Sequence, residues 1–455
     1  MMEKYELCPT DRNIALTFRG DKIGRNSDAI NFAKILNTTD TACTIALDGK
    51  WGSGKTFFVK QTKMLLEIYG NSPGIKLTDE HYSIKKYMED NTLEFGLENF
   101  QPQVVVYYDA WENDNDTDPI LSIIYEIILS IDLELTPTRN KSFFDVVGTI
   151  ADFFTGKNVT ALLNLAKATD PLAKIREQRN IHEQISEFFS SLLKERGNRL
   201  VILIDELDRC KPSYAACLLE RIKHFFNNDS VTFVFSVNLS ELQHTIKQHY
   251  GRDFDAYRYL GRFFDLNISL PPPALGKYLG SVELADNSNL FNVASKTVIE
   301  YYNLQLREIA KFAYLAKIVR DNCANRLRYD FSDELACAFC VLCVVPVMIG
   351  TRLVDIKQYD AMVDGCDDTI FCEIIIKMNL NIIKYILDEE DRRHIAENDC
   401  KRKEVISKKI KMIYYAIFGK IHSGDTESVT IGEMRFEQGL KNYISRVSSL
   451  LLTTD

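Results

Sequence analysis

The stretch TIALDGKWGSGKTFFV, residues Thr44 to Val59, predicts an apolar strand, a glycine-rich loop and a helix in direct succession. Gly49, Gly54, Lys55 and Thr56 fit the P-loop pattern G-x-x-x-x-G-K-[ST]. Glycines let backbone N–H groups approach phosphate oxygens closely, and the positive end of the helix dipole favours the same anion. A tight turn without a ligand is the alternative, but the strand and helix on either side favour phosphate binding.

Two side chains of this loop have predicted chemical roles. The Lys55 ammonium would neutralise the outer phosphates of a nucleotide, and the Thr56 hydroxyl would bind Mg²⁺. Gly52 adds a further flexible position inside the loop. Contacts with the nucleotide are predicted for Gly49, Lys50, Trp51, Gly52, Ser53, Gly54, Lys55, Thr56 and Phe57.

A second informative stretch is RLVILIDELDRC, Arg199 to Cys210, in which five apolar residues predict a buried strand. Asp205 and Glu206 follow at its carboxyl end, where α/β proteins bind their ligands. Downstream of a P-loop this is the Walker B position, so Asp205 would hold Mg²⁺ through a water molecule and Glu206 would polarise the attacking water. The alternative is that DELD only caps the next helix, but its pairing with a P-loop favours the functional interpretation.

Three further apolar runs complete a predicted sheet. They are QVVVYYDAW from Gln103 to Trp111, VTFVFSVN from Val231 to Asn238, and RFFDLNISL from Arg262 to Leu270, which ends at Pro271 to Pro273. Five strands separated by helices predict an α/β fold with a doubly wound parallel sheet. Asn238 is placed to sense a γ-phosphate or to orient water; the alternative is an ordinary turn at the end of the strand.

The sequence therefore predicts two regions. Residues 1–273 form a P-loop domain with a helical insertion at about 132–198, and residues 274–455 form a helical lid and a C-terminal helical domain without a further strand.

Shorter local signals lie between these motifs. Residues 1–24 are polar and predicted to be irregular, and residues 70–101 are polar without a convincing repeat. Asp118 followed by Pro119 is typical of the beginning of a helix.

Charge, the N-terminal residues and the cysteines indicate which classes of protein are not expected. The 455 residues carry a net charge of −9 and a pI near 5.5, which argues against a surface built wholly for nucleic acid. Residues 1–13 lack the apolar core of a signal peptide, and an odd total of eleven cysteines is typical of reduced thiols, so a cytoplasmic protein is expected. Cys337, Cys340 and Cys343 have no fourth ligand at matching spacing, which favours core thiols over a zinc or iron–sulfur site.

Two apolar segments bear on membrane association. Leu335 to Thr351 carries no charge, but its seventeen residues make only about 26 Å of helix and Pro346 interrupts them. The segment FFDVVGTIADFF, residues 143–154, is broken by Asp145, Gly148 and Asp152. A buried helix is predicted for the first segment and a surface or core helix for the second, and no membrane span is expected.

Several motifs together resemble the KAP family of P-loop NTPases, an AAA-related family in the additional-strand, catalytic-glutamate branch. The resemblance rests on GKWGSGKT, YYDAWEND, IDELDRCKPSYAACLLERIKHFF, FVFSVNLSEL, DAYRYLGRFFDLNISLPP and LQLREIAKF, which cover most of residues 20–315. It implies ATP binding and hydrolysis, with a C-terminal helical domain over the nucleotide. The DDLDR of the family reads DELDR here, which places Glu206 as the general base.

The resemblance also implies roles for three arginines. Arg258 or Arg262 would be an arginine finger acting across the subunit interface of a homo-oligomer, and Arg307 would be a lid arginine. Ordinary surface or helix-pairing charges are the alternative for each. Family members often carry transmembrane helices, and many bacterial members resemble parts of phage exclusion or defence systems in which an ATPase controls an effector.

The leading hypothesis is an ATPase that uses ATP and Mg²⁺ and passes a conformational change or assembly step to a protein partner or effector. One alternative is a nucleotide-gated scaffold that turns over little ATP until a partner completes the site. A second is a nucleic-acid-coupled ATPase, supported best by the basic run KRKEVISKKIK from Lys401 to Lys411. Such runs are usually solvated helix faces, so nucleic acid is not favoured.

Overall fold

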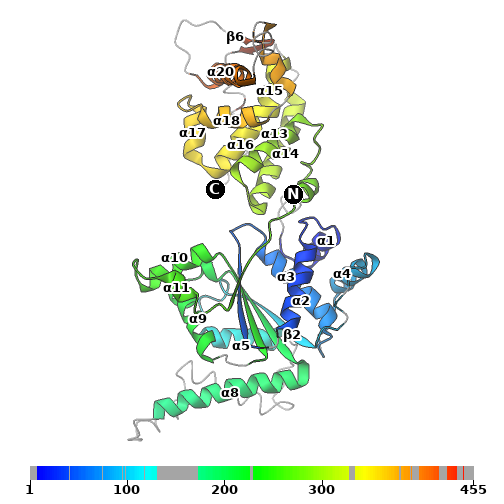
Figure 1. The fold of residues 1–455 in the computed structure, drawn as a ribbon, viewed down its shortest axis with the longest axis vertical. Helices are drawn as coiled ribbons and strands as arrows, with labels where there is room; N and C mark the ends of the chain where they lie inside the picture. The colour runs from blue at the N-terminus through cyan, green and yellow to red at the C-terminus, as the bar shows by residue number, and fades with distance from the viewer. Residues whose placement is uncertain are drawn as a thin grey trace. The chain divides into compact units, whose positions relative to one another are not determined.

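The computed structural model describes residues 8–130, 173–378, 381–437 and 444, apart from gaps at 40, 74, 95, 98, 117, 226–228, 327–333, 390, 392–398 and 420–427. The chain divides into two compact units, Pro9–Ala274 and a second unit that consists mainly of Leu275–Asp455 (Figure 1). The segment 143–154 lies outside the described residues. Of the predicted insertion at about 132–198, only the part from residue 173 onward is described.

A five-stranded parallel sheet forms the centre of the first unit (Figure 1), which confirms the predicted fold class. The strands lie in the order β2-β3-β4-β1-β5. The additional strand β4 therefore separates β1, which leads into the P-loop, from β3, which ends at Asp205. The strand bounds are β1 Cys43–Asp48, β2 Gln103–Asp109, β3 Arg199–Asp205, β4 Val231–Val237 and β5 Leu266–Ser269.

Helices cover both faces of this sheet (Figure 1). On one face α2 packs on α3, and α1 packs on both α3 and α4. On the other face, apolar side chains of α5, α8, α9 and α10 join those of the strands in one buried core. The helix bounds are α1 Asp11–Arg19, α2 Asn26–Thr38, α3 Lys55–Gly70, α4 Asp79–Asp90, α5 Pro119–Ser130, α8 Ala173–Arg196, α9 Pro212–Phe225, α10 Leu239–Tyr250 and α11 Ala256–Leu260.

Two of these helices were not predicted. α1 corrects the prediction that residues 1–24 are irregular, and α4 lies within residues 70–101, for which no element was predicted. Both are short, with few buried apolar residues, so tertiary packing stabilises them more than a clear helical period does. The predicted beginning of α5 is confirmed, because Asp118 Oδ1 accepts a hydrogen bond from the backbone of Ile120 at 2.9 Å.

The fifth strand is shorter than predicted. β5 begins at Leu266 instead of Arg262. The backbone N–H of Arg262 donates to Tyr259 O at 3.1 Å, and that of Phe263 donates to Leu260 O at 2.9 Å. These turn hydrogen bonds extend the end of α11 and delay the start of the strand.

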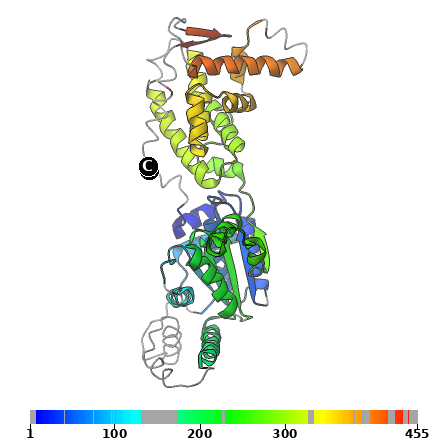
Figure 2. The same cartoon turned by 90° about the vertical axis from the view of Figure 1, so that its left-hand side faces the viewer.

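The second unit is mainly helical, but it contains an antiparallel hairpin of β6 and β7 that contacts α20 (Figure 2). The prediction of no strand after residue 273 is therefore wrong. Each strand has only four residues, too few for a clear alternation, and Gly432 at φ +62° closes the turn. The element bounds are α12 Leu275–Ser281, α13 Leu290–Tyr302, α14 Leu306–Arg326, α15 Glu334–Phe339, α16 Val345–Val354, α17 Ile356–Val363, α18 Thr369–Met378, α20 Asp399–Phe418, β6 Ser428–Ile431 and β7 Met434–Glu437.

Within the described residues, one helix, Leu335–Val354, is long and apolar enough to cross a membrane. This helix is made up of α15, the π-helical turn Cys340–Val344 and α16. Of its most apolar stretch, 72% is buried inside the protein. This burial confirms the predicted core helix. Burial also raises the pKa of the Cys343 thiol to about 12, as expected for a neutral thiol in an apolar core.

The contact between α16 and α13 leads to a stability prediction. A Cβ added at Gly350 would overlap the Val298 Cγ1 atom of α13. We expect Gly350→Ala to lower the free energy of unfolding by about 1–3 kcal/mol, measured by urea denaturation, because a close-packed core has no room for a methyl group. Gly276→Ala on α12 is the matched control, since a Cβ there meets no atom within 4 Å. Equal stability of the Gly350 variant and the wild type would contradict close packing of α13 on α16.

Candidate functional site

The P-loop connects β1 to α3 through backbone conformations that favour glycine. Gly52 and Gly54 have φ angles of +75° and +89°. Gly49 is closely surrounded, because an added Cβ would lie 3.0 Å from Ser53 Oγ and 3.2 Å from Leu270 Cβ. The loop is therefore tightly folded, and the first residue of α3 follows Gly54 directly.

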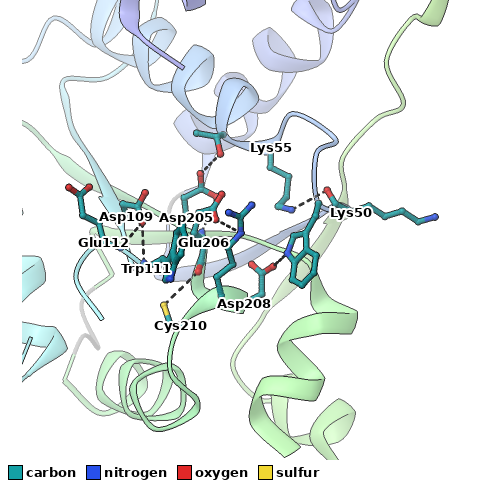
Figure 3. Close-up of polar contacts among 12 residues, drawn as sticks. Lys50, Lys55, Asp109, Trp111, Glu112, Asp205, Glu206, Asp208 and Cys210 are labelled. Carbon is teal, nitrogen blue, oxygen red and sulfur yellow. Dashed lines mark hydrogen bonds and ion pairs between the residues drawn. The ribbon is translucent and has the colours of Figure 1, made fainter. Parts of the chain in front are cut away.

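The Lys55 side chain is folded back over this loop (Figure 3). Its ammonium donates to Gly49 O at 2.6 Å and to Lys50 O at 3.3 Å, and the residue is only 9% exposed. Burial lowers the pKa of this ammonium, while the carboxylates of Asp208 and Asp205 oppose the shift. The structure thus places a buried cation against two carbonyl oxygens at the mouth of a glycine-rich loop.

Asp205 joins the P-loop to the end of β3. It is fully buried, and its Oδ2 accepts a hydrogen bond from Thr56 Oγ1 at 2.7 Å and from the Tyr107 hydroxyl at 3.1 Å. Its Oδ1 accepts from the backbone N–H of Glu206 at 3.1 Å. The two predicted metal ligands, Thr56 and Asp205, are therefore in direct contact, although 149 positions separate them in the sequence.

This pair of oxygen donors fits Mg²⁺. Mg²⁺ is usually held by one or two carboxylates together with the phosphates of its nucleotide, without a cage of protein ligands. Among the described residues, no group of three or more His, Cys, Asp or Glu side chains is placed to hold a metal ion. Thr56 and Asp205 could therefore supply two oxygen atoms to Mg²⁺, with water and phosphate oxygens as its other ligands.

Glu206 follows Asp205 in an unusual backbone conformation. Its φ angle is +62°, in the left-handed region that residues with a side chain seldom adopt. Its Oε2 forms an ion pair with Arg209 Nε. Burial, followed by the neighbouring charge of Asp205, raises the pKa of the Glu206 carboxyl to about 7, and Arg209 opposes this rise. The carboxyl group is thus partly buried beside the P-loop and close to protonation at neutral pH.

Both tryptophans of the chain contact charged residues that follow Asp205. Trp51 Nε1 donates to Asp208 Oδ2 at 2.5 Å, which links the P-loop to the DELDR motif. The Arg209 guanidinium lies over the Trp111 ring, 5.5 Å from its centroid. The sequence analysis predicted neither of these two contacts.

The comparison with protein families agrees with this geometry. The model of the KAP family P-loop domain matches residues 25–319, well over half of the chain. The chain belongs to the KAP family of P-loop NTPases. The resemblance inferred from the sequence is thereby confirmed, and membership supports the binding of a nucleotide. None of the curated proteins matches the chain at a significant level.

Arg25, the first residue of the KAP match, forms a hydrogen bond with the backbone of the P-loop. Its Nη1 donates to Ser53 O at 2.7 Å, and only 3% of its surface is exposed. Burial lowers the pKa of this guanidinium to about 10, although the Asp28 carboxylate opposes the shift. The sequence analysis missed Arg25, because an isolated arginine at the start of a helix does not indicate that it is buried.

Asn238 lies at the end of β4, which neighbours the P-loop strand β1 of this KAP domain. Its side chain caps α10 and accepts a hydrogen bond from the backbone of Glu241 at 3.4 Å. The next residue, Leu239, donates its N–H to Asp48 Oδ1 at 2.9 Å, which ties this turn to the end of β1. This cap agrees with the alternative that Asn238 is an ordinary turn residue at the end of a strand. Because Asn238 also lies at the carboxyl end of β4, its role as a γ-phosphate sensor stays a prediction.

The three predicted arginines lie on exposed surfaces. Arg258 of α11 forms an ion pair with Asp255 at 3.3 Å, and Arg262 is exposed in the turn that follows. Arg307 is an exposed residue of α14 in the second unit. Among the interactions of the described residues, none joins Arg258 or Arg262 to the P-loop.

The basic run from Lys401 to Lys411 is partly neutralised on α20. Lys409 Nζ lies 2.9 Å from Asp388 Oδ2 and 2.8 Å from Asp391 Oδ2. Lys411 Nζ lies 2.8 Å from Asp368 Oδ2. These ion pairs remove part of the charge that supported the nucleic-acid alternative.

Proposed function

We propose that the chain binds ATP with Mg²⁺ and hydrolyses it to ADP and phosphate. The contact of Thr56 with Asp205 carries this proposal, because it joins the P-loop to the acidic end of β3 at 2.7 Å. A loop that only reversed the chain direction would not require a buried carboxylate at this position. Family membership supports the nucleotide, and the side chains supply the reason to expect hydrolysis.

Binding would use the P-loop backbone together with three side chains. Lys55 would exchange its two carbonyl partners for phosphate oxygens, which form stronger, charge-assisted hydrogen bonds with an ammonium. Thr56 would bind Mg²⁺ directly, and Asp205 would bind it through a water molecule. The ion would neutralise the negative charge that develops on the γ-phosphoryl group.

Hydrolysis would place Glu206 as the general base. The oxygen of a water molecule attacks the γ-phosphorus, the bond to the β–γ bridging oxygen breaks, and the water proton passes to the Glu206 carboxylate. Arg209 engages Oε2, which leaves Oε1 for the water. Products are ADP and inorganic phosphate.

The contacts of Lys55 and Glu206 also support a switch. Phosphates would draw Lys55 away from the Gly49 and Lys50 carbonyls, which would change the loop on binding. Arg209 would limit the movement of Glu206 until the ion pair opened. This restraint favours the second candidate function, a nucleotide-gated scaffold whose turnover is slow until a partner acts.

We extend the proposal to a homo-oligomer in the cytoplasm. Arg258 and Arg262 are exposed, so a finger role would require a P-loop in a neighbouring subunit. Arg307 would reach the nucleotide as part of the lid. The resulting conformational change would pass to a protein partner or effector.

Phosphate release from ATP tests the proposed function. We expect Mg²⁺-dependent release that stops on addition of EDTA, because the pair of Thr56 and Asp205 needs the ion to act on phosphates. Turnover per chain should rise with protein concentration, as a finger in trans requires. Tight ATP binding without release at any concentration would favour the scaffold. Failure to bind ATP at all would refute both functions.

A further inference from the structure

A groove lies between α1 and α4, on elements that the nucleotide site does not use. Its volume is about 740 Å³, within the roughly 300–1,000 Å³ range of small-molecule sites. Its walls come from the end of α1, the turn that follows α1, and one face of α4. The lining residues are Leu16, Arg19, Gly20, Lys22, Ser83, Lys86, Tyr87 and Asp90.

The charge of this groove is positive, although the whole chain carries −9. Arg19, Lys22 and Lys86 line the groove together with one carboxylate, that of Asp90. Arg19 Nη1 donates to Ser83 Oγ at 3.2 Å, which holds its guanidinium across the groove from α1 to α4. Among the described residues, neither the Lys22 nor the Lys86 ammonium has a hydrogen-bond or ion-pair partner. Cations that converge in a concave surface attract an anion.

The groove also offers apolar surface beside these cations. Leu16 is 43% exposed on α1. The Tyr87 ring of α4 is half-buried, and it packs edge-on against the fully buried Phe18 with 5.9 Å between ring centroids. A ring held in this way presents a fixed surface on which a flat ligand group can lie.

The turn that lines the groove is followed directly by Arg25, which contacts the P-loop. Gly24 N donates to Asp21 O at 3.0 Å, and Asn26 Nδ2 donates to Phe18 O at 2.6 Å, so the segment between α1 and α2 is firmly folded. Arg25, three residues after the groove-lining Lys22, donates to Ser53 O in the P-loop. A movement of the turn at residues 20–24 would therefore be transmitted to the P-loop through the hydrogen bond from Arg25 to Ser53.

We propose that this groove binds a phosphate-bearing small molecule of nucleotide size and that its occupancy regulates the P-loop through Arg25. The phosphate contacts Lys22, Lys86 and Arg19, and the flat part of the ligand lies against Leu16 and Tyr87. This site is distinct from the P-loop, since none of its lining residues belongs to the loop.

Binding of AMP to the full chain carrying Lys55→Ala tests this site, because AMP combines a phosphate with a flat ring and the substitution weakens the P-loop. Isothermal titration should show saturable binding of one AMP per chain. Adding Lys22→Gln and Lys86→Gln should raise its dissociation constant at least about tenfold, since two charge-assisted hydrogen bonds are lost. Lys85→Gln is the matched control on α4, because Lys85 does not line the groove.

Three results would overturn the proposal of a small-molecule site. These are the absence of saturable AMP binding, equal affinity in the groove variants and the control, and binding of a single-stranded oligonucleotide in place of AMP. Inorganic phosphate is a separate arm, and it should bind more weakly than AMP if Leu16 and Tyr87 contact the ring.

The proposed regulation of the P-loop is tested separately, by the rate of phosphate release in protein that keeps Lys55. AMP should change the rate of phosphate release from ATP more in the Lys85→Gln control than in the Lys22→Gln, Lys86→Gln variant, because only the control keeps both groove lysines. Competition between AMP and ATP at the P-loop is the same in both proteins. An identical response would overturn the coupling. Absence of ATP hydrolysis in every protein would overturn the proposed function while the titration result stands independently.

Discussion

Replacing Glu206 by glutamine is expected to lower ATP turnover by about 10²- to 10⁴-fold while ATP binding is retained. Glutamine has nearly the same size as glutamate, but it cannot take up the proton of the attacking water. The left-handed backbone at this position is unaffected by the change, because both side chains have the same branching. Phosphate release at saturating ATP measures turnover, and isothermal titration measures affinity.

Glu89→Gln is the matched control for this substitution, since Glu89 is exposed on α4 and lies outside both the P-loop and the DELDR motif. It should hydrolyse ATP at the wild-type rate. Because Glu206→Gln also weakens the contact with Arg209, thermal unfolding of the variant should be recorded alongside. A wild-type rate in a folded Glu206→Gln protein would show that another group is the base.

Replacing Lys55 by alanine is expected to weaken ATP binding at least about 100-fold. The reason is the loss of an ammonium that can form two or more charge-assisted hydrogen bonds with phosphate oxygens, each contributing about 1.5–3 kcal/mol. In the structure this ammonium donates its hydrogen bonds to the carbonyls of Gly49 and Lys50, and we expect the fold to tolerate its removal. Isothermal titration with ATP and Mg²⁺ measures the affinity.

Lys85→Ala on α4 controls for the loss of one positive charge from the first unit. Its affinity for ATP should equal that of the wild type. A dissociation constant for Lys55→Ala within about threefold of the wild-type value would contradict the assigned contact with phosphate. In that case Lys55 would serve only to close the loop over its own carbonyls.

The central sheet and the placing of the candidate site residues could be predicted because their signals are local. A buried parallel strand is a continuous apolar run, and the polar side chains that follow it, here Asp205 and Glu206, lie at its carboxyl end. The P-loop combines three glycines with Lys55 and Thr56 over eight positions. The strand order could not be derived from such runs, because it depends on which hydrogen-bonding edges meet after the chain crosses over.

The remaining parts of the site depend on contacts between distant segments. Arg25 reaches Ser53 across 28 positions, and Trp51 reaches Asp208 across 157. No periodicity or composition indicates which buried partner such a side chain finds. The hairpin of β6 and β7 escaped prediction for a related reason, since strands of four residues are stabilised by packing on α20 more than by their own pattern.

The position of the two tryptophans gives the protein a built-in optical probe. The chain has no other tryptophan, so its indole emission comes entirely from Trp51 and Trp111. One indole donates to the Asp208 carboxylate and the other stacks under the Arg209 guanidinium. Indole emission is sensitive to nearby charges and to water, and both rings are about half exposed. Movements of the P-loop and of the DELDR motif can therefore be followed separately without an added dye, through the tryptophan kept in each single Trp→Phe variant.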